Sequence, residues 1–90
     1  MSAPLPATTA VRSGVDGDPT FGAVMPPLYL SSNFSFAGFG TKRQYDYTRS
    51  GNPTRDTLAA ALAELEGAQG CAITATGMAA VTLVAALLDP

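Results

Sequence analysis

The sequence predicts an α/β protein, and three segments in its second half carry that prediction. Residues 52–67 have the pattern of a helix, residues 71–75 form a short apolar run, and residues 76–88 begin a second helix. Helix, strand, tight turn and helix in this order are part of a unit built on a parallel sheet. One strand cannot make a sheet, so we expect these 90 residues to be the first piece of a larger α/β domain.

Composition limits the class of protein before any motif is considered. With 47% apolar and 13% charged residues, the chain is globular rather than a solvated tail, and 90 residues make at most one small domain. A net charge of -2 argues against a nucleic-acid partner, and the absence of histidine excludes imidazole chemistry from this chain.

The cellular setting is predicted from cysteine usage and hydropathy. A single cysteine, Cys71, cannot form an internal disulfide, which suits a reducing compartment. Residues 1–10 lack the pattern of a signal peptide, and the longest apolar run, residues 75–88, is too short to cross a membrane. We expect a cytoplasmic protein with no membrane partner.

Residues 1–51 are predicted to be an irregular N-terminal arm. Proline, glycine, serine and threonine are scattered there among all seven aromatic residues, and the apolar positions follow neither a helical nor a strand period. Pro26 and Pro27 fix the backbone and supply no N–H, which favours extended and turn segments. Because such an arm has little core of its own, we expect it to pack on another part of a larger protein or on another subunit.

Residues 52–90 are predicted to begin the α/β domain. Asn52 is a favoured N-cap, Pro53 suits the first helical position, and Gly67 is the expected stop. Between these signals an apolar stripe falls at helical spacing, formed by Leu58, Ala61, Leu62 and Leu65.

The second helix is predicted from residues 76–88, with Asp89 and Pro90 ending it. It is apolar almost all round, as in helices buried between layers. Its start is a candidate anion site, because a helix N-terminus presents free N–H groups and Gly77 has no Cβ to block a ligand. If this turn is considered alone, the simpler interpretation is that Gly77 only makes a tight turn.

Tyr47 and Arg49 form a second candidate anion site. Two residues apart in an extended segment, they point to the same side and could aim a phenol and a guanidinium at one phosphate or carboxylate. By spacing alone, a solvated arginine beside a packing tyrosine is the simpler alternative.

Other reactive groups are poor candidates. Lys42, the only lysine, lies in a polar loop beside Arg43, and Cys71 is predicted to be a buried structural cysteine. Glu64 and Glu66 do not face each other on a helix, and no cluster has metal-ligand spacing.

The residues "YDYTRSGNPTRDTLAAALAELEG" followed by "TATGMAA" resemble the start of the pyridoxal-phosphate enzymes of cysteine and methionine metabolism. Upstream, "AVRSG" and "MPPLYLSSNFSF" look like the arm of the cystathionine γ-synthase type. The resemblance covers residues 9–90. It implies the large domain of a fold type I, aspartate aminotransferase-like transferase.

The resemblance also implies roles for both candidate sites. In this family the tyrosine and arginine of Y-x-R reach into the neighbouring subunit and bind the phosphate of pyridoxal 5'-phosphate, which places that role on Tyr47 and Arg49. The Gly-Met pair at a helix start binds the phosphate in its own subunit, which places that role on Gly77 and Met78. A homo-oligomer, a dimer or a dimer of dimers, is implied.

The family's Schiff-base lysine and its other catalytic groups have no counterpart among these 90 residues, so we expect no catalytic residue here and no activity from the chain alone. The parent reaction implied is γ-replacement on an O-acylhomoserine by cysteine, with amino acids as small-molecule substrates. Cystathionine γ-lyase, methionine γ-lyase and O-succinylhomoserine sulfhydrylase remain alternatives, and Ser50 occurs in lyase-like members. A short non-catalytic protein that binds a partner subunit is the alternative of another class.

Overall fold

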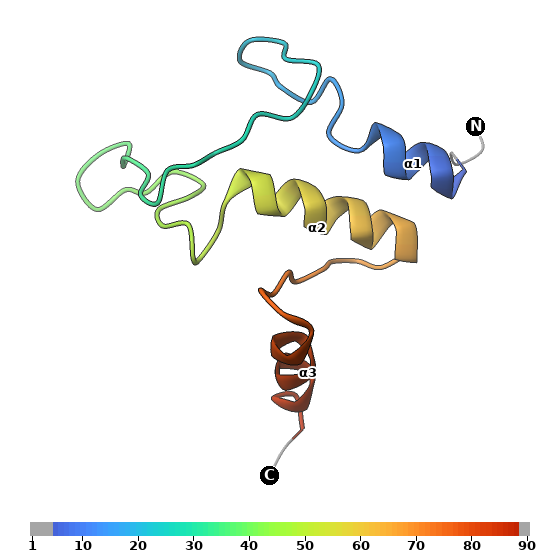
Figure 1. Ribbon diagram of the computed structural model, residues 1–90. Helices are drawn as coiled ribbons and strands as arrows, with labels where there is room; N and C mark the ends of the chain where they lie inside the picture. The colour runs from blue at the N-terminus through green and yellow to red at the C-terminus, as the bar shows by residue number, and fades with distance from the viewer. Residues whose placement is uncertain (1–4, 89–90) are drawn as a thin grey trace.

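The computed structural model describes residues 5–88, which contain three helices (Figure 1). These are α1 (Pro6–Arg12), α2 (Pro53–Glu66) and α3 (Gly77–Ala85). The predicted helix stop at Asp89 and Pro90 lies outside the described residues. No helix within residues 5–88 combines the length and the hydropathy that a membrane crossing requires.

Helix α2 begins and ends as its sequence predicts. The Asn52 side chain accepts a hydrogen bond from the Thr54 N–H at 2.8 Å, and Pro53 occupies the first turn. At the other end Gly67 adopts a left-handed conformation, with φ of 65°. The N–H of Ala68 donates to the carbonyl of Ala63 at 2.8 Å, which completes a Schellman motif.

Helix α1 corrects the prediction that residues 1–51 are irregular throughout. It begins with proline in its first turn and carries Arg12 in its last, which are helix signals, but its seven residues are too few to show an apolar period. The helix packs against α2 in the same chain (Figure 1). After it, Gly14 has φ of 77°, and a Cβ there would lie 2.9 Å from Thr57 Cγ2, so only glycine fits between the two segments.

The remainder of the arm folds back on itself without a regular sheet. Isolated antiparallel bridges join Asn33 to Tyr47 and Gly38 to Thr41. Beside the first bridge, the Phe34 N–H donates to the Asp46 carbonyl at 3.0 Å. These contacts bring the Tyr47 segment beside residues 32–34, ahead of α2.

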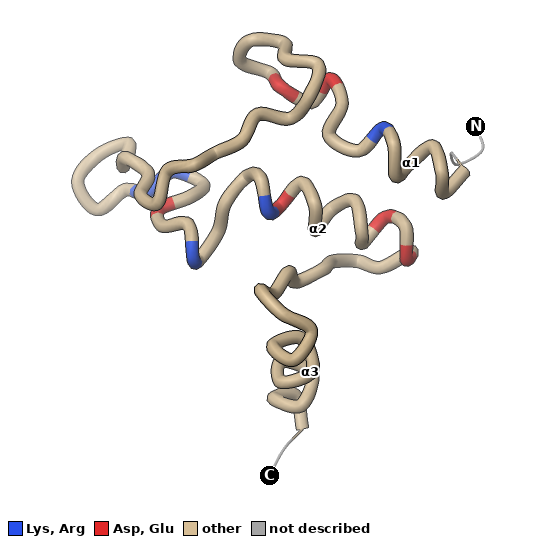
Figure 2. The backbone as a smooth tube through the Cα atoms, in the orientation of Figure 1, with Lys and Arg blue, Asp and Glu red and all other residues tan. Residues whose placement is uncertain are grey.

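The strand predicted at residues 71–75 is not formed, and α3 ends at Ala85 rather than at residue 88. A strand exists only through hydrogen bonds to a neighbour, and the described residues supply no neighbouring strand. Helix α3 extends away from α1 and α2 and carries no charge (Figure 2). Its large apolar residues are exposed, so the prediction of a helix buried between layers is not met within this chain.

Residues 5–88 contain no buried apolar side chain. Within this part of the chain, the buried residues are both polar: Thr9, with 8% of its surface exposed, and Asn52, with 7%. The local order around α2 therefore rests on hydrogen bonds and helix caps more than on a hydrophobic core.

Candidate functional site

The loop from Tyr47 to Gly51 is a tight turn and not the extended segment in which Tyr47 and Arg49 were expected to point to one side. The N–H groups of Ser50 and Gly51 both donate to the Tyr47 carbonyl, at 3.0 and 3.1 Å. The two predicted side chains nevertheless meet. Arg49 Nη2 donates to the Tyr47 hydroxyl at 3.3 Å, and the guanidinium carbon lies 5.3 Å from the centroid of the tyrosine ring. Both side chains are exposed, so a phenol and a guanidinium are available to one anion.

Asn52 ties this loop to the start of α2. Its side-chain amide donates to the Thr48 hydroxyl at 2.6 Å and to the Tyr29 carbonyl at 3.1 Å, while its oxygen caps the helix. Thr48 adds a bond from its hydroxyl to the carbonyl of Ser31 at 2.9 Å. The sequence predicted the cap, because capping is local, but not the contact with a residue 23 positions earlier.

Replacing Asn52 by alanine in the full-length protein should lower the free energy of unfolding by roughly 2–3 kcal/mol. The variant loses a helix cap, worth about 1 kcal/mol, and the two hydrogen bonds from the amide. Urea unfolding measures the change. Asn52→Asp keeps the cap and loses both donors, so an intermediate loss is expected; equal stability of the aspartate variant and the wild type would contradict the role of the amide.

Tyr45 is linked to the first turn of α2 by a hydrogen bond that was not predicted from the sequence. Its hydroxyl donates to Asp56 Oδ2 at 2.5 Å. That bond raises the pKa of Tyr45 to about 12, with smaller contributions from burial and from the carboxylate charge. The residues are 11 positions apart, and a spacing of that kind has no local sequence signal.

The raised pKa of Tyr45 predicts a stability change in strong alkali. The phenol holds its proton more tightly in the folded state, so its contribution is complete below pH 10.0 and is lost as pH rises towards 12. The near-ultraviolet tyrosinate signal, taken as the difference between wild type and Tyr45→Phe, should titrate near pH 12. Asp56→Asn should lower that midpoint; a wild-type midpoint near 10.0 would contradict the contact.

The second candidate site, at the start of α3, has a side-chain cap. The Thr76 hydroxyl accepts from the Ala79 N–H at 3.0 Å. Among residues 5–88, the N–H groups of Gly77 and Met78 have no acceptor, as is usual in the first turn of a helix. Gly77 does not have a positive φ, and a Cβ there would meet no atom within 4 Å. The backbone conformation therefore does not require glycine, which counts against a purely conformational role.

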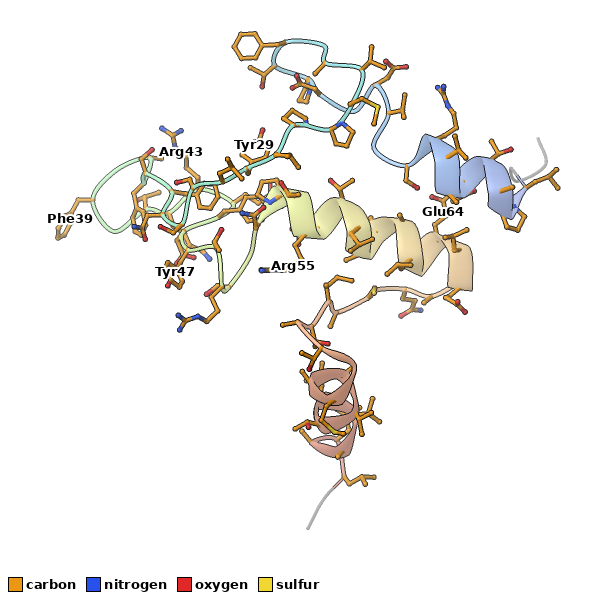
Figure 3. The ribbon with its side chains drawn as sticks, in the orientation of Figure 1. Tyr29, Phe39, Arg43, Tyr47, Arg55 and Glu64 are labelled. Atoms are coloured by element: carbon orange, nitrogen blue, oxygen red, sulfur yellow. The ribbon has the colours of Figure 1, made fainter. Side chains whose placement is uncertain are left out.

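The structure does not bring the two candidate sites together within one chain. Tyr47 lies near the end where α2 begins, and Glu64 lies near the other end of that helix. Helix α3 starts to one side of α2 (Figure 3). Arg49 lines a groove with Arg55 and with residues 71–73 and 75, but Gly77 and Met78 do not line it. Each set of anion-binding groups is thus exposed separately.

The structure also shows the environment of the other reactive side chains. Cys71 is exposed, so the prediction of a buried cysteine is wrong within this chain, because the sheet that would cover it is not formed. Lys42, Glu64 and Glu66 are exposed, as expected for solvated charges. Among the described residues no group of carboxylate, histidine or cysteine side chains could hold a metal ion.

Comparison with known proteins identifies the class. The family model described as "Cys/Met metabolism PLP-dependent enzyme" matches residues 7–90, and the chain belongs to that family. The predicted fold, the start of a pyridoxal-phosphate-dependent α/β transferase, is confirmed by this match and by the solved structures that follow.

The chain is similar to both synthases and lyases of the family, as three relatives illustrate. It is 55% identical over 78 residues to cystathionine gamma-synthase of Escherichia coli, covering 87% of this chain and 20% of that protein. The solved cystathionine gamma synthase of Xanthomonas oryzae pv. oryzae, in complex with aminoacrylate and cysteine, is 66% identical with a TM-score of 0.88, covering 92% and 21%. Cystathionine gamma-lyase of Lactobacillus plantarum is 35% identical with a TM-score of 0.84, covering 96% and 22%. The chain spans about a fifth of the length of these relatives.

The family's cofactor is pyridoxal 5'-phosphate, and the exposed groups fit its phosphate. An added Cβ at Gly77 would meet no atom within 4 Å, and among the described residues the N–H groups of Gly77 and Met78 have no acceptor, so both can donate to a phosphate as helix N-termini do. Arg49 and Tyr47, exposed separately from the start of α3, offer a charged and a neutral donor that contact each other and could bind one phosphate. In this family the cofactor is bound to a lysine. Lys42 does not suit that role, because it is exposed in a loop.

Proposed function

We propose that these residues form the N-terminal part of a trans-sulfuration enzyme of the cystathionine γ-synthase type. The parent enzyme would join an O-acylhomoserine to cysteine and release the acyl group as a carboxylate, which gives cystathionine. The observation that carries the proposal is the difference in identity: 66% to a solved synthase against 35% to a solved lyase, over nearly the same residues.

The proposed roles of the chain's own residues are binding and orientation. Met78 and Gly77 donate backbone N–H groups to the cofactor phosphate in their own subunit. Arg49 and Tyr47 bind the phosphate of a neighbouring subunit, which agrees with their exposure on a loop away from α3. The bound cofactor supplies an electron sink for replacement at the γ-carbon, and a lysine elsewhere in the parent enzyme holds it.

The proposed assembly is a homo-oligomer in which each site is shared between two subunits. Phe39 points away from the rest of the chain (Figure 3), and Phe21 and Leu30 are each 91% exposed. Apolar side chains so exposed on an arm suit burial against another subunit. The 90 residues alone would bind no substrate productively and would be inactive.

Product analysis of the purified full-length protein tests the proposal. With an O-acylhomoserine and cysteine, a synthase produces cystathionine, whereas a γ-lyase given cystathionine releases cysteine, 2-oxobutyrate and ammonia. Homocysteine formed from the ester and sulfide would indicate a sulfhydrylase. No bound cofactor and no turnover of any of these substrates would favour the short non-catalytic alternative.

A further inference from the structure

Tyr45 lies beside the Tyr47–Gly51 turn but belongs to neither candidate site. Its ring packs against Phe34, with the centroids 5.7 Å apart. It also lies against the backbone of Gly51, where an added Cβ would come within 3.1 Å of the ring. Its hydroxyl reaches Asp56 on the first turn of α2. The side chain therefore spans the Tyr47–Gly51 turn from the strand-like segment before it to the helix after it.

The phenol and guanidinium on this turn depend on how its ends are held. Both side chains are exposed, and the described side-chain contact of Arg49 is with Tyr47 itself. The backbone of Arg49 is held by a hydrogen bond of 3.4 Å from Arg55 Nη2 to its carbonyl. Asn52 fixes one side of the turn, and the Tyr45–Asp56 bond fixes the other.

We propose that Tyr45 and Asp56 are a positioning pair that holds the Tyr47–Gly51 turn so that Arg49 and Tyr47 face the cofactor phosphate of the neighbouring subunit. The proposal rests on the phosphate-binding role of Arg49 proposed above. A long arginine side chain loses rotamer freedom on binding, and a turn fixed in advance reduces that loss. The pair touches no substrate or cofactor and acts only through the turn.

The test uses Tyr45→Phe in the full-length enzyme, which keeps the ring and removes the hydroxyl. The dissociation constant of the apo-enzyme for pyridoxal 5'-phosphate should rise about two- to tenfold, the equivalent of one ordinary hydrogen bond. The dissociation constant for pyridoxal, which has no phosphate, should not change. Damage to the fold would weaken both ligands, so the difference between them isolates the positioning role.

Variants of Asp56 supply the reciprocal test. Asp56→Ala should reproduce the effect of Tyr45→Phe, and the double variant should be no worse than either one, because both remove the same bond. Asp56→Asn keeps an acceptor and should largely restore affinity. Glu66→Ala, which removes an exposed carboxylate from the far end of α2, is the matched control and should leave both constants unchanged.

Arg49→Ala measured in parallel separates this inference from the proposed function. If Arg49→Ala weakens pyridoxal 5'-phosphate binding and Tyr45→Phe does not, the positioning pair is wrong and the phosphate role of Arg49 stands. If Arg49→Ala has no effect, the phosphate role fails and the inference built on it fails as well. Equal weakening of pyridoxal and its phosphate by Tyr45→Phe would also overturn the inference.

Discussion

Replacing Gly77 by valine in the full-length enzyme should weaken pyridoxal 5'-phosphate binding by roughly a hundredfold or more, the value of two charge-assisted hydrogen bonds. The branched side chain would occupy the space in front of the N–H groups of Gly77 and Met78. The fold of the chain should persist, because Gly77 does not have a positive φ and a Cβ there meets no atom within 4 Å. Titration of the apo-enzyme with the cofactor, alongside circular dichroism, measures both effects.

Gly77→Ala is the graded control for that experiment. A single methyl group blocks less of the approach than a branched side chain, so the alanine variant should fall between wild type and valine. Normal cofactor occupancy in Gly77→Val would show that the phosphate does not lie at the start of α3.

Arg49→Ala should raise the dissociation constant for pyridoxal 5'-phosphate by about 10- to 150-fold, because it removes a charge-assisted bond to phosphate. The Tyr47 hydroxyl, which accepts from Arg49 Nη2 at 3.3 Å, would remain but without its charged neighbour. Spectroscopic titration of the apo-enzyme measures the change. The helix caps of α2 are untouched, so the thermal unfolding midpoint of the apo-enzyme should stay close to wild type.

Two further variants make the Arg49 result specific. Arg49→Lys keeps the charge but not the planar fork, and an intermediate constant is expected. Arg12→Ala removes an exposed guanidinium that forms a surface pair with Asp16 at 3.8 Å and should not change cofactor affinity. If Arg12→Ala weakened binding as much as Arg49→Ala, the effect would come from overall charge and not from a contact with phosphate.

Features that depend on a few neighbouring residues could be predicted from the sequence. Asn52 caps α2 and Gly67 ends it, as predicted, because caps and left-handed stops depend on a few neighbouring residues. That Tyr47 and Arg49 could act together was a hypothesis based on an extended segment, with a solvated arginine as the simpler alternative; in the structure a turn brings the two side chains into contact. The motif that carries the family resemblance contains these same residues, which is why the family could be recognised before the fold was known.

Contacts between distant segments, and elements that form only against a partner, could not be predicted from the sequence. The Asn52 amide meets Tyr29, and the Tyr45 hydroxyl meets Asp56, because the arm folds back over the start of α2, and no local rule encodes such a pairing. Residues 71–75 have the composition of a strand but form none here, since a strand takes its hydrogen bonds from neighbours that residues 5–88 do not provide. Local conformational preferences fix helix caps and turns, whereas the burial of side chains and the pairing of strands depend on the segments that pack against them.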